Sequence, residues 1–92
     1  MKQVTCFYLK TCPYCMQAKK ALAELIAENP VYAQVPMEWI EENEHPDIIE
    51  QYDYYAVPSM FIGKQKLYEA HKFEGYEECK GNVKAVLDAA ME

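Results

Sequence analysis

The sequence predicts an α/β fold in which a four-stranded mixed sheet is flanked by three helices, in the order β-α-β-α-β-β-α. An apolar, β-prone run at 4–9 leads into a segment whose apolar residues recur every three or four positions, which is typical of a strand followed by a helix. Two short strand patterns around Gly63-Lys64 indicate a hairpin, and a second segment with helical spacing ends the chain. With 92 residues the chain suits one domain, residues 1–92, with a modest core.

The first half of the chain contains two predicted strands and one long helix. The run Val4–Leu9 is continuous enough for a strand that is buried on both faces. The helix is predicted over Pro13–Glu28, with Thr11 as a candidate cap and Asn29-Pro30 as its end. A second strand is predicted at Val35–Ile40. The apolar stripe of the helix consists of Cys15, Ala18, Leu22, Leu25 and Ile26.

The second half of the chain is predicted to complete the sheet and to cover it. An acidic segment, Glu41–Glu44, is interpreted as a solvated loop. A short helix, two strands joined by a tight turn and a final helix follow, predicted at Asp47–Tyr52, Ser59–Ile62, Lys66–His71 and Tyr76–Ala90. The first strand, the long helix and the second strand form a right-handed parallel crossover unit, and the closing hairpin adds antiparallel strands.

Composition excludes several classes of function. The net charge is −6 and all nine basic residues are lysines, so the chain lacks the arginines typical of phosphate and nucleic-acid recognition. No apolar stretch approaches the roughly 20 residues that a membrane span requires. The start, Met1-Lys2-Gln3-Val4, lacks the charged head and apolar core of a signal peptide. We therefore expect a cytoplasmic monomer that binds neither nucleic acid nor membrane.

The motif Cys12-Pro13-Tyr14-Cys15 carries the chemistry of this sequence. It places two thiols at the start of a predicted helix, where free backbone N–H groups and the helix dipole favour negative charge. The thiolate is the nucleophilic form of cysteine, and this environment favours it. Because Cys15 lies on the apolar stripe and Cys12 does not, Cys12 is predicted to attack a disulfide and Cys15 to resolve the mixed disulfide. The expected reaction is thiol–disulfide exchange.

The four cysteines also admit uses other than thiol–disulfide exchange. A tetrahedral zinc site needs two further ligands, and the isolated His45 and His71 do not supply a second ligand pair. Cys6 and Cys79 are predicted to be small buried core residues rather than redox groups. A soft-metal or iron–sulfur site at the same motif, and a non-catalytic adaptor, are the alternatives. We predict no metal ligand.

The chain resembles the thioredoxin superfamily over nearly its whole length, and the dithiol glutaredoxins most closely. The resemblance rests on Cys12-Pro13-Tyr14-Cys15 after the first strand, on Val57-Pro58 before the third, and on the order of the elements. It implies a thioredoxin-like fold in which Pro58 is a cis-proline facing the dithiol. It also implies that the Val57 backbone and Tyr14 contact the substrate, because an extended peptide can pair with an exposed backbone edge.

The same resemblance implies a glutathione site beside the dithiol. Its residues would be Lys10, Pro13, Tyr14, Val57 and Pro58 together with Gly75, Tyr76 and Glu77 at the start of the last helix. Glu74 replaces a family glycine, and its charge is expected to weaken the binding of a glutathione carboxylate. The implied activity is the reduction of protein disulfides or glutathione mixed disulfides, with no tightly bound cofactor. Either glutathione or a thioredoxin-reductase-like flavoprotein would return the protein to its dithiol form.

Overall fold

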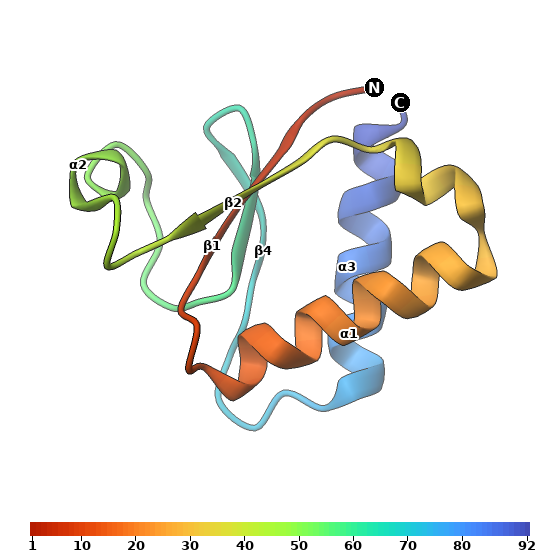
Figure 1. The fold of residues 1–92 in the computed structure, drawn as a ribbon, viewed down its shortest axis with the longest axis horizontal. Coiled ribbons are helices and arrows are strands. Elements are labelled where there is room, and N and C mark those ends of the chain that lie inside the picture. The colour runs from red at the N-terminus through yellow and green to blue at the C-terminus, as the bar shows by residue number, and fades with distance from the viewer.

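A computed structural model describes residues 1–92, and its helices and strands follow the predicted order with one short 3₁₀ turn added. The elements are β1 (Val4–Tyr8), α1 (Pro13–Glu28), η1 (Pro30–Gln34), β2 (Met37–Glu41), α2 (Pro46–Ile49), β3 (Ser59–Ile62), β4 (Gln65–Glu69) and α3 (Tyr76–Ala90). Figure 1 shows α1 and α3 on one side of the sheet and α2 on the other. The two chain ends lie together, where the backbone N–H of Lys2 donates to the carbonyl of Ala90 at 2.8 Å.

The four strands are ordered β2-β1-β3-β4, with β1 parallel to β2 and antiparallel to β3. Strand β4 pairs antiparallel with β3, as expected for the hairpin around Gly63, whose φ of 60° suits a glycine in the turn. The central position of β1 explains its continuous apolar sequence, because both of its faces are covered. The predicted thioredoxin-like α/β fold is confirmed.

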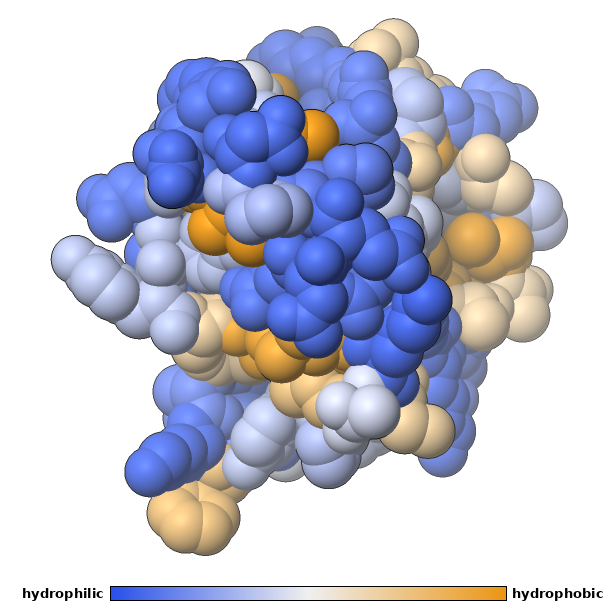
Figure 2. Space-filling model, turned by 60° about the vertical axis from the view of Figure 1, so that its left-hand side comes forward, coloured by the Kyte–Doolittle hydropathy of each residue, from blue (hydrophilic) through white to orange (hydrophobic).

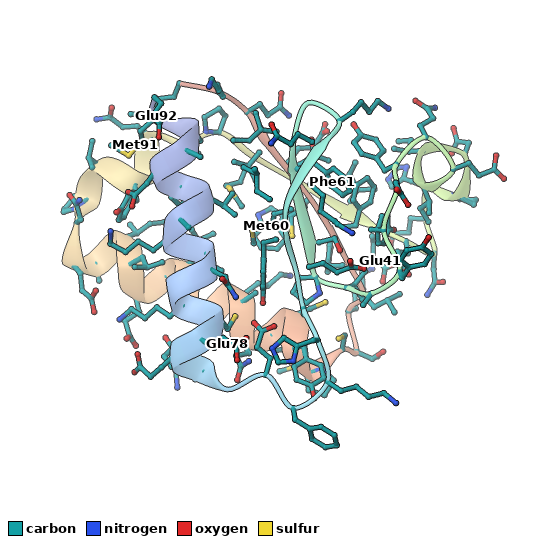
Figure 3. All side chains as sticks on the ribbon, turned by 180° about the vertical axis from the view of Figure 1, so that it is seen from behind. Glu41, Met60, Phe61, Glu78, Met91 and Glu92 are labelled. Atoms are coloured by element: carbon teal, nitrogen blue, oxygen red, sulfur yellow. The ribbon has the colours of Figure 1, made fainter.

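Each face of the sheet has its own apolar cluster. Met60 and Phe61 are neighbours on β3 and both are completely buried, but they point to opposite faces (Figure 3). Phe61 packs with Phe7 and Ile40 under α2, where the rings of Tyr52 and Tyr54 close the cluster. The larger cluster lies between the sheet and the two long helices and includes Val4, Cys6, Ala18, Leu25, Met60, Val83, Val86 and Leu87. Full burial of each large apolar side chain stabilises the fold by about 1.5–3 kcal/mol.

The second strand starts two residues later than the sequence predicts. Val35 is buried, but its N–H donates to the carbonyl of Tyr32 at 3.2 Å and so closes the η1 turn instead of joining the sheet. The carbonyl of Pro36 then accepts from the N–H of Val4 at 2.9 Å, and pairing with β1 begins at Met37. The prediction missed η1 because Asn29-Pro30 indicates only that the helix ends.

The interpretation of Glu41 as part of a solvated loop is wrong. Glu41 is the last residue of β2 and only 6% exposed. Its carboxylate accepts hydrogen bonds from the backbone N–H of Lys10 at 3.1 Å and of Asn43 at 2.6 Å. Because charge-assisted hydrogen bonds offset the loss of hydration, a carboxylate can be buried at this position. Glu41 thereby ties the end of β2 to the loop that precedes the cysteine motif.

Smaller differences concern the ends and faces of elements. Strand β4 ends at Glu69 because the N–H of His71 donates to the Glu74 carboxylate instead of to a strand. Helix α2 ends at Ile49, and only turns continue the chain toward Tyr52. Ala21 joins the buried face of α1, whereas Leu22 and Ile26 are half-buried at its margin. None of the helices is both long and apolar enough to cross a membrane.

Candidate active site

Cys12 is itself the residue that caps α1. Its backbone is extended, with φ −82° and ψ 120°, and its carbonyl accepts from the N–H groups of Cys15 and Met16, each at 3.1 Å. No side chain caps the helix, so the proposed cap at Thr11 is wrong. Pro13 occupies the first turn, where the missing N–H costs little. Cys12 therefore stands at the N–H end of α1.

The Cys12 sulfur lies against the segment that precedes β3. Its thiol donates to the carbonyl oxygen of Val57, with an Sγ–O distance of 3.8 Å, across 45 positions of sequence. The Val57–Pro58 peptide bond is cis, as the resemblance implied. Cys12 is half-buried and Pro58 is buried, so Cys12 is the more accessible of the two residues. Of the predicted site residues, the structure brings Cys12, Cys15, Val57 and Pro58 together.

Cys15 lies beneath Cys12 with an exposed fraction of 1%. Burial raises the pKa of its thiol to about 12, and the neighbouring Cys12 thiol adds to this rise. The backbone of Leu9 and the ammonium group of Lys19 act in the opposite direction and lower the pKa of Cys15. All four cysteines are free, so the structure describes the dithiol form. An accessible sulfur with a protected sulfur behind it suits attack by the first and internal resolution by the second.

The predictions that Cys6 and Cys79 are core residues are confirmed, since both are completely buried. Burial raises the pKa of both thiols, and for Cys6 the proximity of Cys15 adds to the rise. The Cys79 sulfur lies 3.4 Å from the Tyr68 hydroxyl oxygen, within the larger apolar cluster. A buried, protonated thiol is inert, which leaves Cys12 as the accessible cysteine.

The other residues predicted to bind glutathione each have surroundings of their own. The Lys10 ammonium pairs with the Glu44 carboxylate at 2.8 Å, and both side chains are exposed. Tyr76 is half-buried with the Lys20 ammonium 5.0 Å from its ring centroid, so it faces α1. Glu77 lines a cavity of about 300 Å³ between α1 and α3. Gly75 begins α3 in an extended conformation, with open space where a Cβ would lie.

Two residues before α3 have roles that the sequence did not indicate. Glu74 is 4% exposed, and its carboxylate accepts from the Tyr68 hydroxyl and from the backbone N–H of His71 at 3.1 Å. Its charge therefore points into the protein rather than toward a ligand at the surface. Phe73 is 90% exposed and has a φ of 65°, and its N–H donates to the Tyr14 hydroxyl at 2.7 Å. The role of Phe73 depends on a partner 59 positions away, whereas the partners of Glu74, Tyr68 and His71, lie within six positions of it.

One group of side chains in the structure brings enough ligand atoms together for a metal ion. His71, Glu74 and Glu78 place one ligand atom each within 4.8 Å of one another. The ring Nε2 of His71 lies 2.5 Å from the Glu78 carboxylate and 3.9 Å from that of Glu74, which is the geometry of a protonated histidine between two acids. Figure 3 shows Glu78 at the lower end of α3, where these side chains meet. The group does not include either cysteine of the motif.

Comparisons with known proteins agree with this geometry. The family model described as a thioredoxin domain matches residues 2–88. Among solved structures, thioredoxin 1 from the thermophilic eubacterium Thermosipho africanus TCF52B is similar over 98% of this chain and 99% of its own, with 14% identity and a TM-score of 0.56. That identity supports the fold alone, and no curated protein matches the chain. The match over nearly the whole length, with the dithiol beside a cis-proline, shows that this chain belongs to the thioredoxin domain family.

Proposed function

We propose that this protein is a thiol–disulfide oxidoreductase that reduces protein disulfides through Cys12 and Cys15. The observation that carries the proposal is the arrangement of the two sulfurs. Cys12 is half-buried at the start of α1, 3.8 Å from the Val57 carbonyl, and Cys15 is 1% exposed behind it. Membership of the thioredoxin domain family supports this general activity.

The proposed reaction has two exchange steps. The Cys12 thiolate attacks one sulfur of the substrate disulfide, a bond forms between them, and the other substrate sulfur leaves as a thiolate. Cys15 then loses its proton and attacks the Cys12 sulfur, which releases the second substrate thiolate and leaves a Cys12–Cys15 disulfide. The substrate gains two electrons and the dithiol loses two, so the reaction needs no tightly bound cofactor.

We propose that the substrate binds as an extended segment along the Val57 backbone. Val57 precedes β3 and lies outside the sheet ladder, while its carbonyl oxygen already contacts the Cys12 sulfur. A peptide that pairs with this backbone as an added strand would present its own cysteine to Cys12. A folded protein that offers a disulfide in an exposed loop meets this requirement.

For the reductant, we favour a thioredoxin-reductase-like flavoprotein over glutathione. Glutathione carries two carboxylates, and the cation predicted to receive one of them, Lys10, is already paired with Glu44. The first turn of α3 carries Glu77 and Glu78, whose charges compete with an incoming carboxylate for the helix N-terminus. Two features favour a glutaredoxin-like glutathione partner instead. They are the Cys-Pro-Tyr-Cys motif and the open space beside Gly75.

The test compares two reducing systems on one oxidised sample. The protein is incubated with glutathione, or with NADPH and a thioredoxin reductase, and turnover of insulin disulfides is followed. We expect turnover with the reductase, none in a Cys12→Ser variant, and accumulation of a mixed disulfide in a Cys15→Ser variant. A Cys79→Ala variant, which removes a thiol outside the dithiol, serves as the control and should retain turnover. Full activity in Cys12→Ser would exclude the proposed nucleophile, and turnover with glutathione alone would reassign the reductant.

A further inference from the structure

Lys19 lies on the same helix as Cys15, and its ammonium group is held by two aromatic rings. It lies four residues after Cys15 on α1, which places the two side chains on the same side of the helix. The Lys19 ammonium stands 4.2 Å from the ring centroid of Tyr8 and 5.3 Å from that of Trp39. These two rings contact each other edge to face, with 5.7 Å between their centroids. Tyr8 ends β1 and Trp39 is in β2, so the rings hold the ammonium against the sheet edge next to the motif.

The charge of Lys19 is not matched by a carboxylate. Four other lysines, Lys10, Lys66, Lys80 and Lys84, each lie within ion-pair distance of an acidic side chain. Lys19 takes part in none of the ion pairs of the structure, although the chain has a net charge of −6. Aromatic faces attract an ammonium without neutralising its charge. The field of Lys19 therefore reaches its surroundings without cancellation by a bound acid.

The groups that face Cys15 leave Lys19 as the one cation among them. Burial and then the neighbouring thiol of Cys12 raise the pKa of Cys15, and burial and then the proximity of Cys15 raise the pKa of Cys6 on β1. Lys19 lowers the pKa of both Cys6 and Cys15. None of the groups that shift the pKa of Cys15 is a carboxylate.

We propose that Lys19, held above Tyr8 and Trp39, assists the resolving step by stabilising the Cys15 thiolate as it forms. The inference rests on the dithiol exchange proposed above and concerns its second step. In that step Cys15 gives its proton to solvent, its sulfur bonds to the Cys12 sulfur, and the substrate leaves as a thiolate. Lys19 forms no bond in this step, and Tyr8 and Trp39 are the positioning residues for its charge. Because Cys15 is only 1% exposed, water hydrates its thiolate poorly, and a nearby fixed cation favours the negative form.

The experiment separates the two exchange steps by rapid mixing with dipyridyl disulfide, an uncharged reagent that releases a coloured thiopyridone. The first release reports attack by Cys12 and its rate depends on reagent concentration. The second release reports attack by Cys15 and its rate does not. Lys19→Gln, Lys19→Arg and Lys20→Gln are compared with the unchanged protein over a range of pH and salt. Lys20→Gln is the matched control, because Lys20 is the next residue, loses the same charge and lies over Tyr76 instead.

In Lys19→Gln we expect the second release to slow by about two- to five-fold at each pH below the pKa of Cys15, because an exposed charge acts through partly screened surroundings. The curve of the logarithm of the second-release rate against pH shifts toward higher pH in this variant. The difference in rate from the unchanged protein becomes smaller as salt is added. Lys19→Arg restores the rate, and Lys20→Gln behaves like the unchanged protein. Thermal unfolding checks that every variant is folded.

Three results would overturn the inference while leaving dithiol exchange intact. They are equal rates of the second release in Lys19→Gln and the unchanged protein, equal slowing by Lys20→Gln, or a deficit that neither salt nor arginine alters. A slowed second release that salt cannot change would mean that Lys19 acts by packing alone. If the unchanged protein gives no second release at all, the proposed dithiol exchange fails, and this inference fails with it.

Discussion

The backbone N–H of Phe73 donates a hydrogen bond to the side-chain oxygen of Tyr14, at 2.7 Å and across 59 positions of sequence. Tyr14 lies between the two cysteines of the motif, so the segment before α3 is tied directly to the dithiol. Phe73 is the one residue other than glycine with a positive φ, at 65°, and its ring is 90% exposed. The strained backbone thus directs an N–H group toward the motif, while its side chain makes little contact with the protein.

We expect Phe73→Gly to raise the free energy of unfolding. A left-handed backbone costs a residue with a Cβ about 1–2 kcal/mol, whereas glycine adopts it freely but loses more entropy on folding, so a net gain of roughly 0.5–1 kcal/mol remains. Urea unfolding of the variant beside Phe73→Ala measures this gain. Phe73→Ala keeps the Cβ and removes only an exposed ring, so its stability should match the original. A Phe73→Gly variant less stable than Phe73→Ala would contradict the assigned strain.

We expect Glu41→Ala to lower the free energy of unfolding substantially. The Glu41 carboxylate is buried and accepts from the N–H groups of Lys10 and Asn43, both of which would lose their partner. Hydrogen bonds to a charged group are worth about 1.5–3 kcal/mol, so a loss in that range is expected in urea unfolding. Glu38→Ala is the control, because Glu38 is an exposed glutamate of the same strand. Similar losses for both variants would show that Glu41 is not held as described.

Figure 2 shows the side of the molecule that carries α2, where much of the surface is hydrophilic and apolar atoms gather mainly toward the right-hand edge. Replacing a surface residue such as Glu38 is expected to change the free energy of unfolding by no more than about 0.5 kcal/mol. The unfolding measurement must therefore distinguish a change of that size from the larger one expected for Glu41. The difference between the two glutamates is therefore one of burial and hydrogen bonding, since both carry the same charge.

The stability contributed by His71 should depend on pH. A hydrogen bond to Glu78, with smaller contributions from the Lys72 carbonyl and Glu74, raises the pKa of His71 above its ordinary value of 6.5. Because the folded-state pKa is the higher one, this contribution is fully present below the unfolded value of 6.5 and is lost as pH rises through the folded value. The difference in unfolding free energy between the original protein and His71→Gln measures it.

That difference should be largest under mildly acidic conditions and should shrink under alkaline ones. Proton NMR titration of the His71 ring provides an independent check, because Glu78→Gln should bring its pKa back toward 6.5. His45→Gln is the control for the loss of a histidine elsewhere on the surface. A stability difference that grows with rising pH would reverse the assigned sign.

Alkylation should distinguish the four thiols at neutral pH. Cys15, whose pKa burial raises to about 12, is thiolate on the order of once in 10⁵ molecules at that pH. Cys6 and Cys79 are completely buried, and burial raises the pKa of both. Iodoacetamide is therefore expected to label Cys12 first, as peptide mass spectrometry can show. Labelling of Cys6 or Cys79 at the same rate as Cys12 would mean that the core opens more readily than this packing allows.

Much of the fold followed from local sequence. Pro13 and Asn29-Pro30 delimit α1 because of stereochemistry within a few residues, and both ends of α3 were predicted as they are found. The strand pairing across Gly63 likewise depends on a short turn. Element ends were missed where a side chain takes the backbone group, as when the Glu74 carboxylate binds the N–H of His71 and β4 ends early.

The sequence by itself determined that α1 begins with a more accessible cysteine, Cys12, and a buried one, Cys15, because their spacing of three residues and the apolar stripe of the helix set which of them faces the core. Only the tertiary structure decided what surrounds them. The carbonyl of Val57 beside Cys12, the rings of Tyr8 and Trp39 under Lys19, and the burial of Glu41 all join segments far apart in the chain. Such contacts depend on how the sheet and helices pack. The type of a charged or hydroxyl-bearing residue does not indicate whether its side chain faces water or another side chain.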